Sequence, residues 1–394
     1  MIDNTVIAKA WNLLPAFVSD PVAATIDRVQ GVQVPLTPRV DQSHPVRVFI
    51  GPVNYAGQAY RWGRAMEQNP GVVSRNMVGA ENNLFGYPAD LAVRWRTMTH
   101  SRSWRREFLN TLVTGYTHIM VEAEMPLLGG AYGQDVRKQV QALRDRGLTV
   151  GMIAHGTDIR LPSRHRELEP WSHYRDDEWA PVVHIERVVQ RNLDMLADIG
   201  APTFVSTAGL LIDVPYAHLL PVVIDPEFWA NDEVTLARER PRVLHIPSNP
   251  ITKGTLLIDP AMRGLDDEGL IEYIQPPGLT QGQMPALYAV ADIVLDQFRA
   301  ADYGVGACES MAAGRLVVSH VSEQVRDVVR TESGVDLPIV EATVDTLDEV
   351  LRDVLTRRGH YREVAARGPE FVRRLHDGRH ARASLERHFL FTDR

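Results

Sequence analysis

The stretch that decides the fold reads YGVGACESMAAG, residues 303–314 of the 394-residue chain. Apolar, β-branched runs flank it at 293–296 and 315–320, and both are typical of buried strands. Gly304 and Gly306 stand where the preceding loop would open into a short helix. A strand, a glycine-bearing loop, a helix and a second strand together form the repeating unit of a parallel α/β sheet.

The same alternation of short apolar runs and helical stretches extends along the chain from residue 46. One series of expected strands comprises 46–51, 117–121, 148–154 and 203–206, and a second comprises 242–246, 270–274, 293–296, 315–320 and 337–340. Two such series predict two doubly wound, parallel-sheet α/β domains.

The domain boundaries follow from the polar stretch after residue 225. We expect an N-terminal domain at 1–225, a C-terminal domain at 226–374 and a final helix at 375–394 that packs back on the N-terminal domain. Short helices are also expected at 4–29, and the chain after the second sheet, 362–390, is expected to be helical.

Composition excludes several kinds of partner. Asp and Glu outnumber Lys and Arg by 50 to 42, whereas a nucleic-acid-binding surface is normally basic. The single cysteine, Cys308, excludes an intrachain disulfide and a cysteine-based zinc cluster, and we expect it to be a small buried residue. No export signal is visible in residues 1–10, and the apolar runs are shorter than the roughly 20 residues of a membrane-spanning helix. We therefore expect a soluble protein of the cytoplasm.

Ligands of open parallel sheets bind beyond the C-terminal ends of the strands, so the residues after each strand are the candidates. A helix starting at Gly304 presents unpaired backbone N–H groups and the positive end of its dipole, which suit a nucleoside diphosphate. Glu309, one turn into this helix, could accept hydrogen bonds from ribose hydroxyls. Alternatively, the glycines only allow close helix packing, and Glu309 is a first-turn charge that favours the dipole.

Two other positions offer contacts to phosphate. Lys253 lies in the loop 245–255, and its ammonium group could neutralise a departing diphosphate. Alternatively, it is an exposed loop lysine without a role. Gly57 stands at an expected helix start after the strand 46–51, where it would let phosphate or sugar approach. A turn without a ligand is the alternative for Gly57.

Polar residues also follow two further strands. His155 could hydrogen-bond a sugar or orient an acceptor hydroxyl, with Asp158 three residues further on. Alternatively, His155 is a satisfied polar residue. Glu122 and Glu124 follow the strand 117–121, and each is either a carboxylate of the site or a solvated charge.

These motifs resemble a known family. Residues 303–318, with the pattern YGxxxxESMAAGxxVV, look like the nucleotide-sugar signature of the retaining glycosyltransferases of family four. Segments 54–58, 155–158 and 253–255 fall in the family's order, and 375–378 resembles the start of its closing helix. The resemblance implies the GT-B fold, in which two Rossmann-like domains face a cleft. It also implies a nucleotide-sugar donor, transfer with retention, and neither a metal nor any other cofactor.

One departure from the family concerns the transferred sugar. The family carries a glutamate eight residues before the position of Glu309, and Ala301 stands there in this chain. The sugar would then be held by Asp302 or by backbone amides. The residues expected at the donor site are accordingly Asp302, Tyr303, Gly304, Val305 and Glu309.

A second departure concerns the diphosphate. Ser248 stands where family members commonly carry an arginine, so that its hydroxyl, Lys253 and the helix start would bind the phosphates. By resemblance, we expect His155, Lys253 and Asp158 to take part in catalysis.

Basic and aromatic residues alternate within residues 94–106. Such a pattern could hold anionic lipid or an anionic acceptor, which would make the acceptor a lipid-linked or phosphate-bearing glycan at the inner membrane face. A solvated basic helix face is the alternative. The residues concerned are Arg94, Trp95, Arg96, His100, Arg102, Trp104, Arg105 and Arg106.

Three other functions fit the same scaffold. A nucleotide-sugar epimerase shares two such domains, and so does a phosphorylase, although a phosphorylase needs a lysine-bound cofactor and a much longer chain. A non-catalytic protein that binds nucleotide sugars is the third, and Ala301 is the feature that favours it.

Overall fold

The computed structural model describes residues 35–83, 85–176, 181–276 and 280–392, together with Val18, Pro21, Val22, Thr25 and Val29. The helices expected at 4–29 fall outside the described residues, apart from those five. The chain divides into two compact units, residues 1–153 with 198–201 and residues 154–197 with 202–394.

The first sheet has the strand order β3-β2-β1-β4-β5-β6-β7, and its paired strands run parallel. The chain order reverses between β1 and β4, which is the topological switch point of a Rossmann-like sheet. The four strands expected here are present, with ends shifted by at most one residue, and β2, β3 and β7 were not predicted. The strands are β1 (Val46–Gly51), β2 (Val72–Gly79), β3 (Leu91–Val93), β4 (His118–Glu122), β5 (Thr149–Ala154), β6 (Thr203–Val205) and β7 (His218–Leu219).

The second sheet is also parallel, in the order β12-β11-β10-β8-β9. Numbered along the chain this order is 2-1-3-4-5, so its switch point lies between β8 and β10. All five expected strands are present, with ends shifted by at most two residues. The strands are β8 (Arg242–His245), β9 (Glu272–Ile274), β10 (Ile293–Leu295), β11 (Leu316–Ser319) and β12 (Ile339–Glu341).

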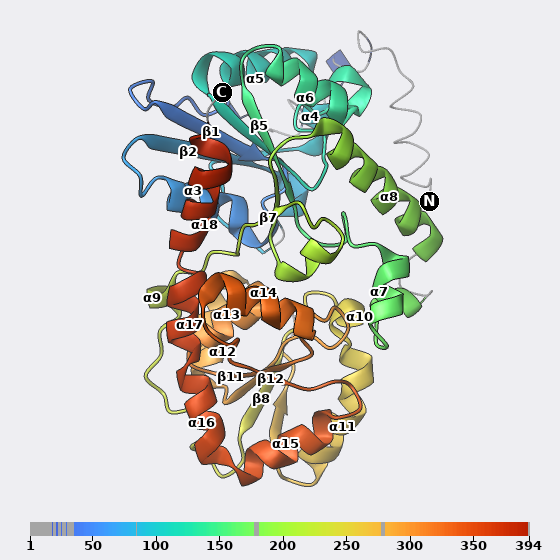
Figure 1. The fold of residues 1–394 in the computed structure, drawn as a ribbon, viewed down its shortest axis with the longest axis vertical. Helices are drawn as coiled ribbons and strands as arrows, with labels where there is room; N and C mark the ends of the chain where they lie inside the picture. The colour runs from blue at the N-terminus through green and yellow to red at the C-terminus, as the bar shows by residue number, and fades with distance from the viewer. Residues whose placement is uncertain are drawn as a thin grey trace. The chain divides into compact units, whose positions relative to one another are not determined.

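Helices follow most of the strands (Figure 1). Those between the strands of the first sheet are α3 (Gln58–Met66), α4 (Trp95–His100), α5 (Arg102–Gly115), α6 (Val136–Arg144), α7 (Pro162–Leu168) and α8 (Val182–Ile199). The later helices are α9 (Pro226–Trp229), α10 (Pro250–Lys253), α11 (Thr255–Asp267), α12 (Met284–Val290), α13 (Val305–Ala312), α14 (Glu323–Ser333), α15 (Leu347–Thr356), α16 (Arg358–Ala366), α17 (Gly368–Leu375) and α18 (Arg379–Leu385).

The core of the second sheet lies under α11, α15 and α16. Apolar residues of these helices meet Val243, Ile293 and Leu316 of the strands in one buried cluster. α13 packs against β11 and α17. The positions of α13 and the loop before it are therefore fixed by the packing of the second unit.

The C-terminal helices reach the edge of the first sheet. Ser384 in α18 donates a hydrogen bond of 2.9 Å to the carbonyl of Leu219 in β7, and a π-helical turn, Glu386–Leu390, follows. The predicted boundaries of the three domains stay predictions. Across the described ranges, no helix has both the length and the apolar character needed to cross a bilayer.

Candidate functional site

The switch point of the second sheet positions the first group of candidate residues. β8 ends at His245 and β10 at Leu295, and these residues are paired, so the loops after the two strands leave the sheet side by side. His245 donates from Nδ1 to the carbonyl of Leu295 at 2.9 Å and accepts at Nε2 from the hydroxyl of Thr255 at 2.8 Å. Burial lowers the pKa of His245, so a neutral ring fixes the start of α11.

Lys253 ends α10, the short helix after β8. Its ammonium group pairs with the carboxylate of Asp296, the first residue after β10. Its carbonyl accepts a hydrogen bond of 3.1 Å from the amide of Phe298, and Arg299 donates to the carbonyl of Ile251 at 3.3 Å. These bonds hold the turn after β8 against the loop after β10.

The start of α13 lies beside this ion pair. Gly304 is the N-cap, and no side chain among the described residues caps the helix. Apart from its chain neighbours, no atom of the described residues lies within 4 Å of the position that a Cβ at Gly304 would occupy. The Oδ1 atom of Asp296 lies 3.7 Å from the equivalent position at Gly306. The structure thus brings together Lys253 and the helix start, which the sequence offered as separate features.

Glu309 and Cys308 lie further along α13. Cys308 is buried, as expected, and burial raises the pKa of its thiol. The side chain of Glu309 is only 5% exposed, and the hydroxyl of Tyr288 donates to its Oε2 at 3.5 Å. Its predicted contact with a ribose stays a prediction, and the hydroxyls would have to reach a largely buried carboxylate.

Tyr303 is anchored inside the second unit. Its hydroxyl donates to Nε2 of His376 at 3.1 Å, and Nδ1 of His376 donates to the carbonyl of Val222 at 2.9 Å. Burial lowers the pKa of His376 to about 4, which keeps the ring neutral. Because the carbonyl of Val222 can only accept, the proton of the neutral ring is on Nδ1. Tyr303 therefore fixes the start of the glycine loop through its side chain.

Both carboxylate oxygens of Asp302 accept hydrogen bonds from protein groups. Oδ1 accepts from the amide of Tyr303 at 2.9 Å, and Oδ2 accepts from the amide of Gly209 at 3.2 Å and from Arg160 at 3.0 Å. Asp302 is 2% exposed and Arg160 9% exposed. The sequence did not predict this buried ion pair, which joins the loop after β10 to the segment after His155. The substitution of Asp302 for the family's glutamate stays a prediction.

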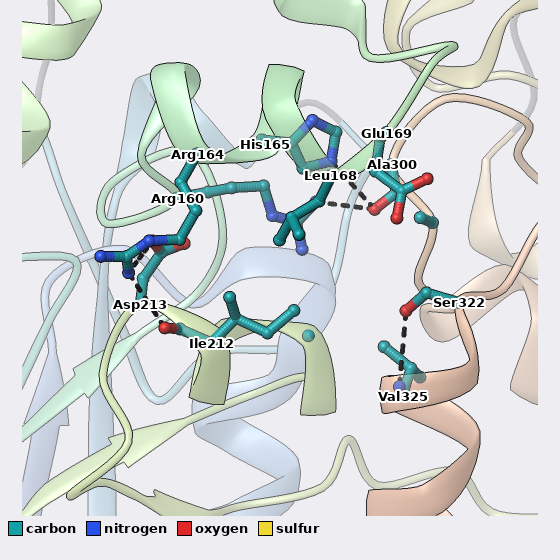
Figure 2. Close-up of a pocket in the computed structure, with 12 residues that line it drawn as sticks. Arg160, Arg164, His165, Leu168, Glu169, Ile212, Asp213, Ala300, Ser322 and Val325 are labelled. Atoms are coloured by element: carbon teal, nitrogen blue, oxygen red, sulfur yellow. Dashed lines mark hydrogen bonds and ion pairs between the residues drawn. The ribbon is translucent and has the colours of Figure 1, made fainter.

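A small pocket opens beside Ala301, at the position of the family's glutamate. Arg164 and Asp213, which form an ion pair of 2.9 Å, lie on one side of it, and Glu169 and Ser322 lie on the other (Figure 2). Burial raises the pKa of Asp213.

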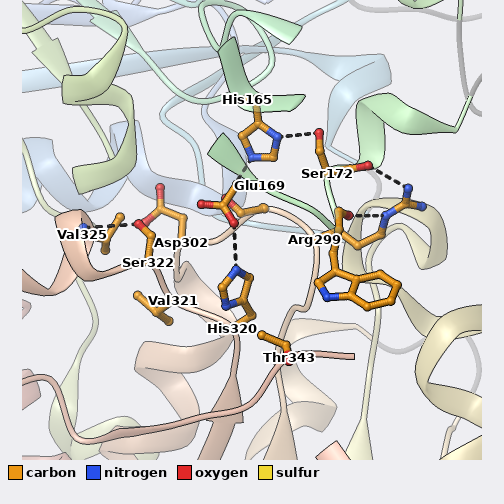
Figure 3. A network of polar contacts seen from close by, with 12 residues as sticks. His165, Glu169, Ser172, Arg299, Asp302, His320, Val321, Ser322, Val325 and Thr343 are labelled. Atoms are coloured by element: carbon orange, nitrogen blue, oxygen red, sulfur yellow. Dashed lines mark hydrogen bonds and ion pairs between the residues drawn. The ribbon is translucent and has the colours of Figure 1, made fainter. Parts of the chain in front are cut away.

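Two histidines in the polar network near the pocket carry different charges (Figure 3). His165 donates from Nε2 to the carbonyl of Ala300 at 3.3 Å and accepts at Nδ1 from Ser172 at 2.7 Å, and burial lowers its pKa to about 3. His320 lies between Glu169, at 2.9 Å, and Glu341, at 2.6 Å. Burial alone would lower its pKa, but the two carboxylates outweigh this and raise it to about 9.

His155 and Asp158 form a local turn after β5. The carboxylate of Asp158 accepts from the amides of His155, at 2.8 Å, and Gly156, at 2.5 Å, and Ser206 donates to the carbonyl of His155 at 3.2 Å. Asp158 thus shapes the turn that carries the imidazole. Their predicted catalytic roles stay predictions.

Gly57 belongs to the first unit, at the switch point of the first sheet. It caps α3 with φ of 73°, and a Cβ there would lie 3.1 Å from the ring of Tyr87. Glu122 accepts from the amides of Val53 and Asn54, both at 3.1 Å, and so holds the loop before Gly57.

Of the two alternatives for Glu122, the last residue of β4, and for Glu124, the solvated charge is wrong. Glu122 is 0% exposed and Glu124 is 6% exposed. The reason is that the first lies under the loop after the neighbouring strand, where it serves as a buried acceptor for backbone amides.

The remaining donor-site candidates are less enclosed. Ser248 is exposed in the loop before α10. The segment considered for the nucleobase begins in β9, where the hydroxyl of Tyr273 and the side-chain amide of Gln275 both donate to Asp259 at 3.0 Å. Its last two residues, 277 and 278, lie outside the described residues.

The predicted basic and aromatic surface at 94–106 is wrong for Trp104. This side chain is 5% exposed and stacks on Phe108, one helical turn away, with 4.8 Å between the ring centroids. Helical periodicity therefore turns it toward the core. Arg105 donates to two backbone carbonyls at the end of α4. The arginines that are exposed are Arg94, Arg102 and Arg106.

Comparisons with known proteins identify the fold. No protein-family model and no curated protein sequence matches the chain. Sucrose-phosphate synthase from Thermosynechococcus elongatus matches with a TM-score of 0.56 and 13% identity over 86% of this chain and 97% of that chain. HepE of Anabaena in complex with UDP matches with a TM-score of 0.55 and 11% identity over 87% of this chain and 99% of that chain. A glycosyltransferase from Rickettsia africae matches with a TM-score of 0.55 and 10% identity over 87% of this chain and 97% of that chain. The expected GT-B fold with two Rossmann-like parallel-sheet domains is confirmed.

Proposed function

We propose that the chain is a retaining glycosyltransferase that moves a sugar from a nucleoside-diphosphate donor to an acceptor hydroxyl without a metal ion. The observation that carries the proposal is the position of Lys253 beside the start of α13. An ammonium group and unpaired backbone N–H groups at the carboxyl end of a parallel sheet form an anion site. HepE, which has the same fold, was solved in complexes with UDP and with UDP-glucose.

The donor is held and activated as follows. Lys253 and the backbone amides at the start of α13 stabilise the negative charge that develops on the departing diphosphate. The amides of Gly304 and Val305 hold the sugar, because Asp302 is occupied by protein groups. His155, on the turn shaped by Asp158, orients the acceptor hydroxyl.

Retention is proposed to result from attack on the same face as the departing diphosphate. A double displacement would need a carboxylate free to act as nucleophile. In the pocket beside Ala301, Glu169 is bonded to His320 and Asp213 is paired with Arg164. Neither carboxylate is therefore free, which favours attack assisted by the leaving phosphate.

The acceptor is proposed to be a carbohydrate or a lipid-linked glycan in the cytoplasm. Exposed Arg94, Arg102 and Arg106 support a contact with anionic lipid at the inner membrane face. Changing these three arginines to glutamine should abolish binding to vesicles that contain anionic phospholipid. Unchanged vesicle binding would remove this part of the proposal.

A non-catalytic protein that binds nucleotide sugars is the second candidate. Two observations favour it: Ala301 lacks a carboxylate, and the neighbouring Asp302 is committed to Arg160. Such a protein would keep the diphosphate site and lack turnover.

A panel of UDP, GDP, ADP and TDP sugars tests both candidates on the full-length protein. Thermal shift reports binding, and release of nucleoside diphosphate, with and without acceptors, reports turnover. Lys253→Met should slow release more than it weakens binding, and Glu309→Gln should mainly weaken binding. Lys138→Met, which removes a lysine paired with Asp135 in the first unit, is the matched control. Binding without release selects the second candidate, and no thermal shift with any nucleotide refutes both.

A further inference from the structure

Asp296 is a buried acid for which the proposed reaction has no use. It directly follows β10, is 6% exposed, and its amide donates to the carbonyl of Val318 at 3.2 Å, which fixes its backbone against β11. Oδ1 binds the ammonium group of Lys253. Oδ2 is also buried, and no donor reaches it from the part of the chain that the structure describes.

An unpartnered buried carboxylate oxygen is costly, because the group has lost water without gaining a full set of hydrogen bonds. Such an arrangement is expected where a protein prepares a site for a ligand. The carboxylate lies beside Gly306 in the first turn of α13, where the backbone N–H groups would receive a phosphate.

The charges around Asp296 explain what it does there. Its carboxylate and the ammonium group of Lys253 form a neutral pair, whose side chains are 5% and 18% exposed. The ammonium group has three N–H donors, so it can keep one on Asp296 and offer the others to a phosphate. A bound diphosphate would therefore share Lys253 with a resident anion, and the two anions would repel each other.

Resting on the proposed function, we propose that Asp296 is a built-in counter-anion of the diphosphate site that positions Lys253 at the start of α13 and weakens diphosphate binding. Without Asp296, Lys253 would be a largely desolvated charge without compensation until a phosphate arrived. With it, the empty site is stable and the diphosphate product is released more readily. Asp296 is thus a positioning residue that acts through Lys253.

Pyrophosphate is the probe for this role, because it reports on the phosphates without depending on the base or the sugar. Its dissociation constant is measured by calorimetry on the full-length wild type and Asp296→Asn. Loss of one like charge a few ångström away should tighten pyrophosphate binding about tenfold. Asp296→Asn should also melt at a lower temperature than the wild type without ligand and gain more from added pyrophosphate.

The matched control is Asp292→Asn, at the other end of the same strand. Asp292 is fully buried and accepts from the amides of Leu236 at 2.7 Å and Arg242 at 2.9 Å. This variant should lose stability and keep the pyrophosphate affinity of the wild type. Because Asp296→Asn could fold poorly, the same substitution is also made together with Lys253→Met, which removes both buried charges. The double variant should bind pyrophosphate more tightly than Lys253→Met alone.

The proposal would be overturned if Asp296→Asn left pyrophosphate binding unchanged or weakened it, both in the otherwise wild-type protein and together with Lys253→Met. Tighter binding in a protein that neither binds nor turns over nucleotide sugars would sustain the role of Asp296 and refute the glycosyltransferase. Failure of the two proposals is therefore distinguishable.

Discussion

Replacing His320 with glutamine should remove a fall in the stability of its unit that occurs as the pH rises from about 6.5 to about 9. Both ring nitrogens of His320 point at carboxylates, Nε2 at Glu169 and Nδ1 at Glu341. Only the protonated ring has two N–H groups to donate. Arg326 and the amide of Val321 also bind Glu341, each at 2.9 Å, and hold that carboxylate in place.

The magnitude follows from the pKa of His320, which is raised from an ordinary 6.5 to about 9. Burial opposes the charge, and the hydrogen bonds to the two carboxylates outweigh it. Because the folded pKa lies above the unfolded one, the contribution to stability is fully present below pH 6.5 and is lost as the pH rises through about 9. With an allowance for the solvated part of the ring, the loss is about 2–3 kcal/mol.

The assay combines two measurements. NMR titration of the imidazole, identified by its absence in His320→Gln, should give a pKa of about 9. Urea unfolding of wild type at pH 6 and pH 9.5 should show a fall in the free energy of unfolding that His320→Gln lacks. His360→Gln, on an exposed turn of α16, should behave like wild type. A pKa of His320 at or below 6.5, or equal pH dependence in the two proteins, would refute the reasoning.

Three further substitutions test other contacts. Glu122→Ala leaves two buried amides without an acceptor and should lower the free energy of unfolding by about 3 kcal/mol, measured by urea; a loss under about 1 kcal/mol contradicts the buried role. Tyr303→Phe removes the donor to His376 and should cost about 1 kcal/mol, whereas equal stability would show that the bond is unimportant. Gly129→Ala would place a Cβ 2.1 Å from a backbone carbonyl oxygen and should cost at least about 3 kcal/mol. At Gly133 no other atom of the described residues lies within 4 Å of such a Cβ, apart from chain neighbours, so Gly133→Ala should cost only about 1 kcal/mol for its positive φ. Similar losses in the two variants would refute the steric argument.

The eight-residue strand β2 shows why a strand with a polar centre is hard to predict from the sequence. β2 was missed because Ser74, Arg75 and Asn76 interrupt its apolar pattern. In the structure, Glu67 accepts from the amide of Ser74 at 2.9 Å and pairs with Arg75 at 3.2 Å, and Asp90 accepts from the amide of Asn76 at 2.9 Å. These partners come from other elements, so local periodicity carries no trace of them.

The phosphate-binding candidates could be predicted because strand ends are visible in the sequence. Lys253 and Gly304 follow the two strands on either side of a switch point, and the general rule for parallel sheets selects both. The predicted strand 293–296 included Asp296 as its last residue. A charged residue directly after three apolar ones more often marks the first position after a strand. Its pairing with Lys253 joins residues 43 positions apart and depends on the strand order.

The predicted role of Asp302 in place of the family's glutamate shows a second limit of prediction from sequence. Adjacency to Ala301 in the sequence made it a candidate for the sugar, but its partner Arg160 lies 142 positions away, beyond the reach of any local pattern. Even the backbone responds to such long-range contacts, since Ala301 has φ of 52°, a conformation that is unfavourable for a residue with a Cβ.

The contacts of the loop after β10 argue that its geometry is fixed before a ligand binds. Ala300 accepts from His165, Ala301 accepts from the amide of Ser322 at 3.0 Å, and Tyr303 is bonded to His376. A left-handed alanine persists only where surrounding contacts outweigh its strain, and these bonds supply them. Little ordering of this loop would then accompany binding, so affinity at the start of α13 would depend chiefly on charge. For that reason, a neutral substitution at Asp296 should act on diphosphate affinity more strongly than a substitution of Ile212 or Val325, two apolar residues that line the pocket beside Ala301.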